Sequence, residues 1–280
     1  MKEAMYYESK EDLVSCKLCP HHCQLKLDQK GRCQVRQNKS GKLMSLNDGF
    51  LSAVNSDPIE KKPLYHFMPG TKTLSIGSYG CNFKCDYCQN YDISMETPRT
   101  SHYTSEDIVR LALSNELPSI SYTYNEPTVF YEFMLRTAKL ARENGLKNIM
   151  VTNGYISREP LEELLPYMDA MNIDLKTYDK DLYQSVCEGR LENVLETIQI
   201  ASKSCHVEVT MLIVPRMNDS VEAMEVFLKT LSETCPHIIL HLSRYFPRYK
   251  REDAPTSLAL LDEMKRIGKK YFEHVYVGNV

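Results

Sequence analysis

The sequence predicts an α/β protein: a parallel, partial (β/α)6 barrel with a cysteine-rich N-terminal extension. Two observations support this prediction. From residue 71 to residue 280, short strand patterns alternate with longer helix patterns, and such alternation is typical of parallel strands joined by right-handed crossovers. Residues 1–70 lack the alternation and contain four of the ten cysteines. We therefore expect an extension over 1–70 and a partial barrel over 71–280.

The expected strands are short, apolar and rich in β-branched or aromatic residues. They cover residues 73–78, 119–125, 147–153, 170–176, 206–214 and 238–245, with a further short strand near 273–279. Between them, apolar residues recur with the spacing of an amphipathic helix. These expected helices cover residues 105–115, 127–144, 159–168, 192–204, 220–234 and 257–272.

Side-chain alternation places polar residues on one face of several strands, because successive strand residues point to opposite faces. Asn172, Asp174 and Lys176 share a face of the fourth strand, and Glu208 and His241 lie on polar faces of the next two. Helices pack on the apolar faces, so the polar faces line the interior, where unpaired charge is costly. We interpret the interior as the binding space of a polar, charged ligand. The alternative is a sheet with one wet face, which is rare among parallel sheets.

Three cysteines, Cys81, Cys85 and Cys88, lie in the segment CNFKCDYC directly after the first strand. Loops that follow strands form the mouth of such a barrel, where active sites collect. Thiolates select zinc or iron–sulfur clusters, and structural or electron-transfer centres usually close with four protein ligands. Three thiols therefore predict a catalytic metal centre with one open position. The alternative is that a distant cysteine completes the set.

The extension contains four further clustered cysteines, Cys16, Cys19, Cys23 and Cys33. Four thiols are enough to close a zinc site or an auxiliary iron–sulfur cluster, and the spacing does not decide between the two. A metal would help this short segment to fold. The alternative is four reduced cysteines without a metal. The single cysteines Cys187, Cys205 and Cys235 are expected to be buried thiols.

Composition excludes several classes of protein. No apolar run approaches the roughly 18 residues of a membrane span, and the first residues do not resemble a signal peptide. We therefore expect a cytoplasmic protein, in whose reducing surroundings clustered thiols bind metals rather than form disulfides. Lys and Arg number 34 against 37 Asp and Glu, a net charge of −3 that argues against a nucleic-acid partner.

The motif CNFKCDYCQN, after the first strand of a βα series, resembles the radical S-adenosylmethionine (radical SAM) superfamily. Within it, the chain is similar to the pyruvate formate-lyase activating enzyme group and most of all to the branch called AmmeMemoRadiSam. The segments that carry this likeness are CKLCPHHC with a later GRC, SDPIEKKPLYHFMPG, SYGCNFKCDYCQN and TYNEPTVF. The resemblance covers most of the chain.

The resemblance implies that Cys81, Cys85 and Cys88 hold a [4Fe–4S] cluster, whose fourth iron takes the amino and carboxylate groups of S-adenosyl-L-methionine. One electron then yields methionine and a 5′-deoxyadenosyl radical, which abstracts a hydrogen atom from the substrate. In YNEP, Asn125 and Glu126 stand where the family has a glycine-glycine-glutamate segment that binds the methionine amine.

Further cofactor-binding roles follow from the same resemblance. Thr152 and Asn153 would lie near the ribose, and Asp174 and Lys176 match the Asp-x-Lys of the activating enzymes, with Lys176 facing the methionine carboxylate. His241 matches a histidine near the cofactor. For the Asp–Lys pair the alternative is an ion pair that plugs the barrel, and for His241 it is a satisfied core residue.

The activating enzymes install a glycyl radical on a partner enzyme, so the resemblance implies a protein or peptide substrate and a reductant such as flavodoxin or ferredoxin. One alternative is radical modification of a lipid or small molecule. Alternatives of other classes are a non-catalytic iron–sulfur electron carrier, which needs neither a polar interior nor an open iron, and a zinc-ribbon module for nucleic acid, which the net charge disfavours.

Overall fold

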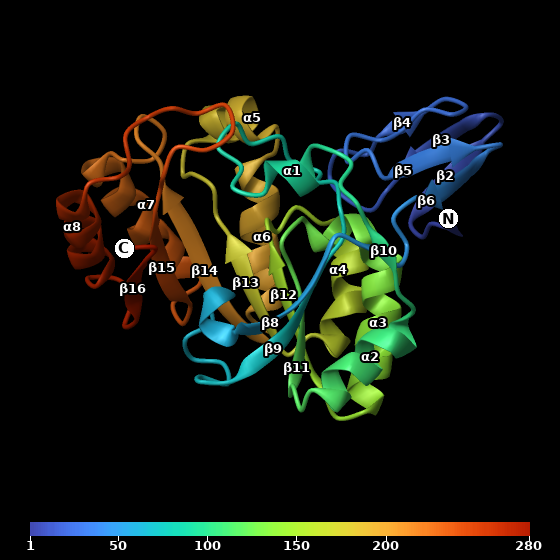
Figure 1. Ribbon diagram of the computed structural model, residues 1–280. Helices are drawn as coiled ribbons and strands as arrows, with labels where there is room; N and C mark the ends of the chain where they lie inside the picture. The colour runs from blue at the N-terminus through green and yellow to red at the C-terminus, as the bar shows by residue number, and fades with distance from the viewer.

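The computed structural model describes residues 1–280, and its centre is one twisted eight-stranded sheet (Figure 1). The strand order is β16-β15-β14-β13-β12-β11-β9-β8, and all neighbours are parallel except the antiparallel pair β8–β9. The strands are β8 (Ala53–Pro58), β9 (Lys72–Gly77), β11 (Ser119–Tyr122), β12 (Lys147–Thr152), β13 (Ala170–Asp174), β14 (His206–Ile213), β15 (Ile239–Arg244) and β16 (Val275–Gly278). The ends of this order do not pair, so the predicted partial barrel is confirmed.

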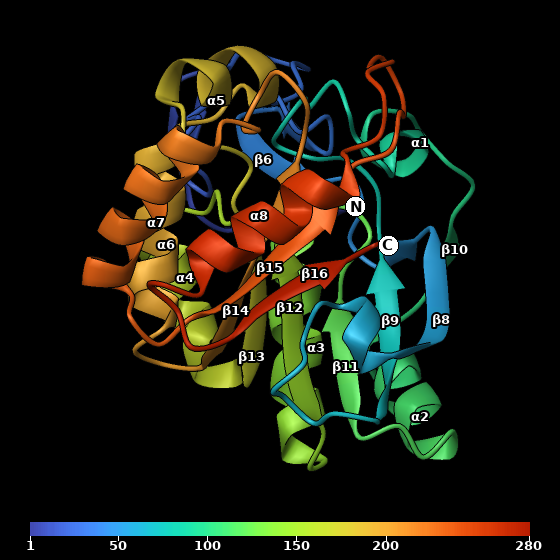
Figure 2. The same ribbon diagram turned by 90° about the vertical axis from the view of Figure 1, so that its left-hand side faces the viewer.

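Helices cover the outer side of the sheet, where they bury its apolar face (Figures 1 and 2). The main helices are α2 (Ser105–Ser114), α3 (Tyr131–Glu143), α4 (Arg158–Leu164), α6 (Leu191–Ala201), α7 (Val221–Thr234) and α8 (Leu258–Gly268). Each matches a helix expected from the sequence. Figure 2 shows α8 lying across β15 and β16, which it contacts directly. No helix has the length and apolar character needed to cross a membrane.

Several short elements are absent from the sequence prediction. They are α1 (Tyr91–Ser94), α5 (Lys180–Cys187) and the 3-10 turn η1 (Ile59–Lys61). Two expected helices are divided in the structure: η2 (Pro127–Phe130) is a 3-10 turn at the start of the helix expected at 127–144, and η3 (Leu165–Tyr167) is one near the end of the helix expected at 159–168. Because β8 precedes η1 and pairs with β9, the central sheet begins before the expected boundary at residue 70.

The N-terminal segment forms two small antiparallel sheets beside α3 and α4, at the end of the molecule away from β16 (Figure 1). One joins β1 (Lys2–Glu3), β6 (Lys42–Ser45) and β5 (Arg36–Lys39); the other joins β2 (Tyr7–Lys10), β3 (Leu13–Cys16) and β4 (Gln24–Leu25). A separate short pair joins β7 (Phe50–Leu51) and β10 (Ser101–His102). The buried Arg36 guanidinium ties this segment to Glu132 of α3 through two hydrogen bonds of 2.6 and 2.8 Å.

Candidate active site

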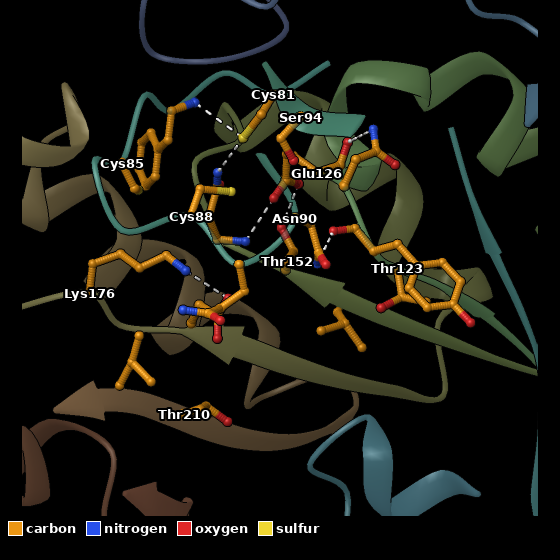
Figure 3. Close-up of a pocket in the computed structure, with 18 of the residues that line it drawn as sticks. Cys81, Cys85, Cys88, Asn90, Ser94, Thr123, Glu126, Thr152, Lys176 and Thr210 are labelled. Atoms are coloured by element: carbon orange, nitrogen blue, oxygen red, sulfur yellow. Dashed lines mark hydrogen bonds and ion pairs between the residues drawn. The ribbon is translucent and has the colours of Figure 1, made fainter. Parts of the chain in front are cut away.

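A cavity of about 480 Å3 opens at the carboxyl ends of the central strands, where the sequence predicted an active site. Most residues predicted to bind a metal or cofactor line it: Cys81, Cys85, Cys88, Asn125, Glu126, Thr152, Asn153, Asp174 and Lys176. Figure 3 shows the three cysteines grouped on one side of this space. The predicted polar interior is therefore confirmed at this level of the sheet.

The cysteine loop, residues 78–90, follows β9 and is anchored by Asn125 of the neighbouring strand end. The side-chain oxygen of Asn125 accepts a hydrogen bond from the Ser78 N–H at 2.9 Å, and its amide donates to the Gly80 carbonyl at 2.9 Å. Both ends of the amide therefore bind backbone that leads into Cys81. In the structure, Asn125 positions the loop, in addition to lining the cavity.

The Cys81 sulfur lies among N–H donors. It accepts hydrogen bonds from the Phe83 N–H at 3.4 Å and from the Asn153 amide at 3.8 Å. Donors of this kind stabilise the charge on a thiolate, and hydrogen bonds to sulfur also tune the potential of a bound cluster. Burial raises the pKa of the Cys81 thiol, and the hydrogen bond from the Phe83 N–H opposes that rise.

Glu126 is a buried carboxylate with both oxygens occupied. Oε1 accepts from the Thr128 N–H at 3.0 Å and from the Thr152 hydroxyl at 2.7 Å, and Oε2 accepts from the Asn153 N–H at 2.8 Å. Burial raises the pKa of Glu126, and these hydrogen bonds oppose the rise. The carboxylate joins the start of η2 to the end of β12, so it holds Thr152 and Asn153 against the cavity.

Asp174 and Lys176 point into the cavity from the end of β13, as the alternation predicted, while Ile173 and Leu175 are buried in the core. The Lys176 Nζ lies 2.8 Å from Asp174 Oδ2. Burial alone would lower the pKa of Lys176, but the neighbouring Asp174 carboxylate raises it well above the usual range. Lys176 therefore stays cationic inside the cavity.

His241 does not line the cavity, although the sequence analysis assigned it a cofactor-binding role. It lies deeper in the interior, with Nε2 at 2.5 Å from Glu208, whose carboxylate also accepts from the Tyr65 and His66 N–H groups. Burial would raise the pKa of Glu208, but hydrogen bonds from His206, His241 and the two backbone N–H groups lower it to about 2. In the structure, His241 is a buried core residue whose ring is hydrogen-bonded to Glu208. We call this buried pair, which lies below the cavity, the floor of the interior.

The family model named "Radical SAM superfamily" matches residues 75–228, which begins in β9 and includes the cysteine loop. The chain belongs to the radical SAM superfamily. It is 44% identical to an uncharacterized protein of Methanocaldococcus jannaschii, across 100% of this chain and 86% of that one. It is 29% identical to another protein of that organism, which is named provisionally as a glycyl-radical enzyme activating enzyme, across 72% of this chain and 79% of that one.

Among solved structures, a radical SAM methyltransferase from Sphaerobacter thermophilus is similar in fold. The TM-score is 0.60 at 17% identity, over 76% of this chain and 67% of that one. This likeness shows that the partial barrel is a radical SAM fold, as expected from the resemblance of the cysteine motif.

The superfamily implies a [4Fe–4S] cluster and S-adenosylmethionine, and the cavity suits both. Three thiols provide cluster ligands, and acidic, basic and amide groups suit a ligand that bears a carboxylate, an amine and a sulfonium. No three Cys, His, Asp or Glu side chains are arranged to hold one metal ion. A cluster distributes its thiolates over several irons, so it does not require that arrangement.

The four N-terminal cysteines meet in a second, much smaller cavity, next to Asn82 and Thr128 of the partial barrel. The sequence predicted that these thiols form one group, and the structure brings them to one place: Cys16, Cys19, Cys23 and Cys33.

Two features of the site were missed by the sequence analysis. Cys187, at the end of α5, lies behind the loop against Cys85, and its sulfur is 3.6 Å from the Tyr87 hydroxyl. It does not line the cavity. The contact joins segments far apart in the chain, so no local signal marked it.

The second missed feature is a hydrogen-bonded group in the wall of the same cavity. Lys62 Nζ and the Tyr124 hydroxyl lie 2.8 and 2.6 Å from Asp57 Oδ2. The pKa of Asp57 is lowered, because these two hydrogen bonds outweigh the rise caused by burial. The segment SDPIEKKPLYHFMPG contains both Asp57 and Lys62, so the motif was noticed but its place in the cavity wall was not.

Proposed function

We propose that this radical SAM protein is an activating enzyme that abstracts a hydrogen atom from a partner protein or peptide. The observation that carries the proposal is the shared cavity, in which three thiols meet the Asp174–Lys176 pair and ample free space. When bound, a [4Fe–4S] cluster at Cys81, Cys85 and Cys88 supplies a low-potential electron, and S-adenosyl-L-methionine supplies the radical chemistry.

The side chains around the thiols would hold S-adenosyl-L-methionine. Lys176 presents a cation for its carboxylate, with Asp174 keeping the ammonium in place at 2.8 Å. Asn125 and Glu126 hold the loop and the wall. Asn125 Oδ1 and Glu126 Oε2 each accept one hydrogen bond within the protein, which leaves each oxygen a lone pair for an amine.

Thr152 and Asn153 provide hydroxyl and amide groups for the ribose at the end of β12. His241 is not included in this set, because it lies in the floor against Glu208.

A protein or peptide substrate is favoured by the similarity to a relative named for activating a glycyl-radical enzyme. The Asp57–Lys62–Tyr124 group would contact such a substrate, because it lines the same cavity as the three thiols. Asp57 and Lys62 lie in the segment SDPIEKKPLYHFMPG, which also supports membership of the AmmeMemoRadiSam branch. A reductant such as flavodoxin or ferredoxin would supply the electron. None of the ten cysteines is paired in a disulfide, in keeping with a cytoplasmic location.

The test is product analysis with the anaerobically reconstituted protein. Incubation with S-adenosyl-L-methionine and a strong reductant should release 5′-deoxyadenosine and methionine, and Cys85→Ala should release neither. An electron carrier would release none from the wild type. Candidate partner proteins with deuterated backbone glycines should then transfer deuterium into 5′-deoxyadenosine. Transfer only from a lipid or small molecule would replace the protein-substrate proposal.

A further inference from the structure

The four N-terminal cysteines form a closed site. Their side chains line one small cavity, which has far less free space than the active-site cavity. Cys16 and Cys33 are nearly inaccessible, while Cys19 and Cys23 are half-buried in the turn that follows β3. Four thiols complete the usual ligand set of a structural or electron-transfer centre. This site therefore has no position left for an exogenous ligand.

Arg36 provides a second, independent sign that this cavity binds an anionic centre. Its side chain is buried, and its terminal nitrogens are bound to Glu132 and to the Met5 carbonyl. Its Nε is also buried but has no hydrogen-bond partner, and Arg36 lines the cavity of the four thiols. Buried donors are normally paired. A metal centre ligated by thiolates carries negative charge and would supply the missing acceptor.

The wall between this closed site and the active-site cavity is one short piece of chain. Gly80, immediately before Cys81, has a φ of +83°, and a Cβ there would lie 2.6 Å from the Cys33 carbonyl oxygen. Asn82, immediately after Cys81, lines the four-cysteine cavity, and its carbonyl lies 2.8 Å from the His21 Nε2. Both chain neighbours of Cys81 therefore touch the segment that contains the four thiols.

Hydrogen bonds also connect this short piece of chain to the active site. The Asn82 side-chain oxygen accepts from the Asn153 amide at 2.8 Å, and Asn153 also donates to the Cys81 sulfur. The Asn82 amide donates to the Tyr155 carbonyl at 2.8 Å. Residues 80–82 therefore contact both thiol groups' surroundings, the N-terminal segment on one side and the active site on the other.

We propose that Cys16, Cys19, Cys23 and Cys33 hold a redox-active [4Fe–4S] cluster that relays electrons to the active site past Asn82. One electron would enter from a reduced, low-potential one-electron donor of the flavodoxin or ferredoxin class. It would reduce this cluster, and the cluster would be reoxidised by passing the electron to the cluster at the three-cysteine loop. Zinc has no redox chemistry, so zinc at these four thiols would rule out the relay. The inference rests on the proposed function for its acceptor.

The first test measures metal content and redox behaviour, independently of activity. Reconstituted wild type should contain about eight irons per chain, four for each cluster, and negligible zinc. Cys19→Ser should lose half of the iron, whereas Cys205→Ser, a matched change of a half-buried thiol elsewhere, should lose none. The triple variant Cys81→Ala/Cys85→Ala/Cys88→Ala should keep about four irons. Electron paramagnetic resonance should show that this iron undergoes reversible one-electron reduction.

The second test measures electron transfer. In Cys19→Ser, reduction of the remaining cluster by a reduced flavodoxin should fall to the background rate, while a small chemical reductant should act as in the wild type. Zinc in place of half the iron, a triple variant without reducible iron, or an unchanged rate with flavodoxin would each overturn the relay. A triple variant with reducible iron, combined with no S-adenosyl-L-methionine cleavage by the wild type, would instead refute only the proposed function.

Discussion

The two groups of clustered cysteines differ in ligand number and in space. The loop at Cys81, Cys85 and Cys88 offers three thiols beside a cavity of about 480 Å3 with charged walls. The N-terminal group offers four thiols around about 20 Å3, with the buried Arg36 beside them. An incomplete ligand set next to open space suits a centre that binds and transforms a ligand. A complete set without space suits a centre that only stores or passes charge.

The largest expected effect comes from changing the open set itself. Cys88→Ala removes one of three thiols, so cluster content at the loop and S-adenosyl-L-methionine cleavage should fall to background. Cys187→Ala is the matched control, because this thiol touches Cys85 but does not line the cavity. Product analysis should find 5′-deoxyadenosine from Cys187→Ala. If both variants were equally inactive and equally poor in iron, Cys187 would be a fourth ligand and the open site would be closed.

Glu208 lies in the floor below the open cavity, and it should stabilise the folded protein in a pH-dependent manner. Its pKa falls from 4.5 to about 2 in the folded chain, which corresponds to about 3 kcal/mol of unfolding free energy. Because the folded pKa is the lower one, this stability is present above about pH 4.5 and is lost as the pH falls toward 2.

Urea unfolding of wild type and Glu208→Gln across this pH range tests the floor. The wild type should be more stable by about 3 kcal/mol near pH 7, and the gap should close in acid. The exposed Glu196 provides the control, since Glu196→Gln should leave stability within about 0.5 kcal/mol of the wild type. A gap that stayed constant from pH 7 to acid would show that Glu208 contributes through packing alone.

A smaller effect, on the binding of S-adenosyl-L-methionine, is expected from a change of Lys176. This charged side chain lines the open cavity and not the closed one. A charge-assisted hydrogen bond to a carboxylate contributes roughly 1.5–3 kcal/mol. Lys176→Met should therefore weaken S-adenosyl-L-methionine binding by roughly 10- to 150-fold while the cluster at the loop stays intact. Equilibrium binding with Lys180→Met, a change of an exposed lysine, provides the comparison. Unchanged affinity together with lower stability would identify the Asp174–Lys176 pair as a structural plug.

What the sequence could predict was local. The alternation of AMNIDLK was enough to place Asp174 and Lys176 inside, and the spacing of CNFKCDYC was enough to place three thiols at the mouth. The strand β8 escaped notice because AVNSDP is a polar edge strand that ends in proline.

Long-range pairing was beyond the local patterns. His241 matched a cofactor-binding position, but its partner Glu208 lies on the neighbouring strand β14 and engages it in the floor. The unpaired Nε of Arg36 and the contact of Gly80 with the Cys33 carbonyl likewise depend on how the N-terminal sheets dock. Such contacts are set by tertiary packing, which no spacing of residues encodes.

The comparison of an open and a closed thiol site is tested most directly by Mössbauer spectroscopy of iron-labelled protein with and without S-adenosyl-L-methionine. The ligand should change the spectrum of one iron of the cluster at Cys81, Cys85 and Cys88. The triple variant Cys81→Ala/Cys85→Ala/Cys88→Ala, whose remaining iron lies in the closed site, should show no change. A ligand-induced change in that triple variant, or none in the wild type, would contradict the assignment of an open and a closed site.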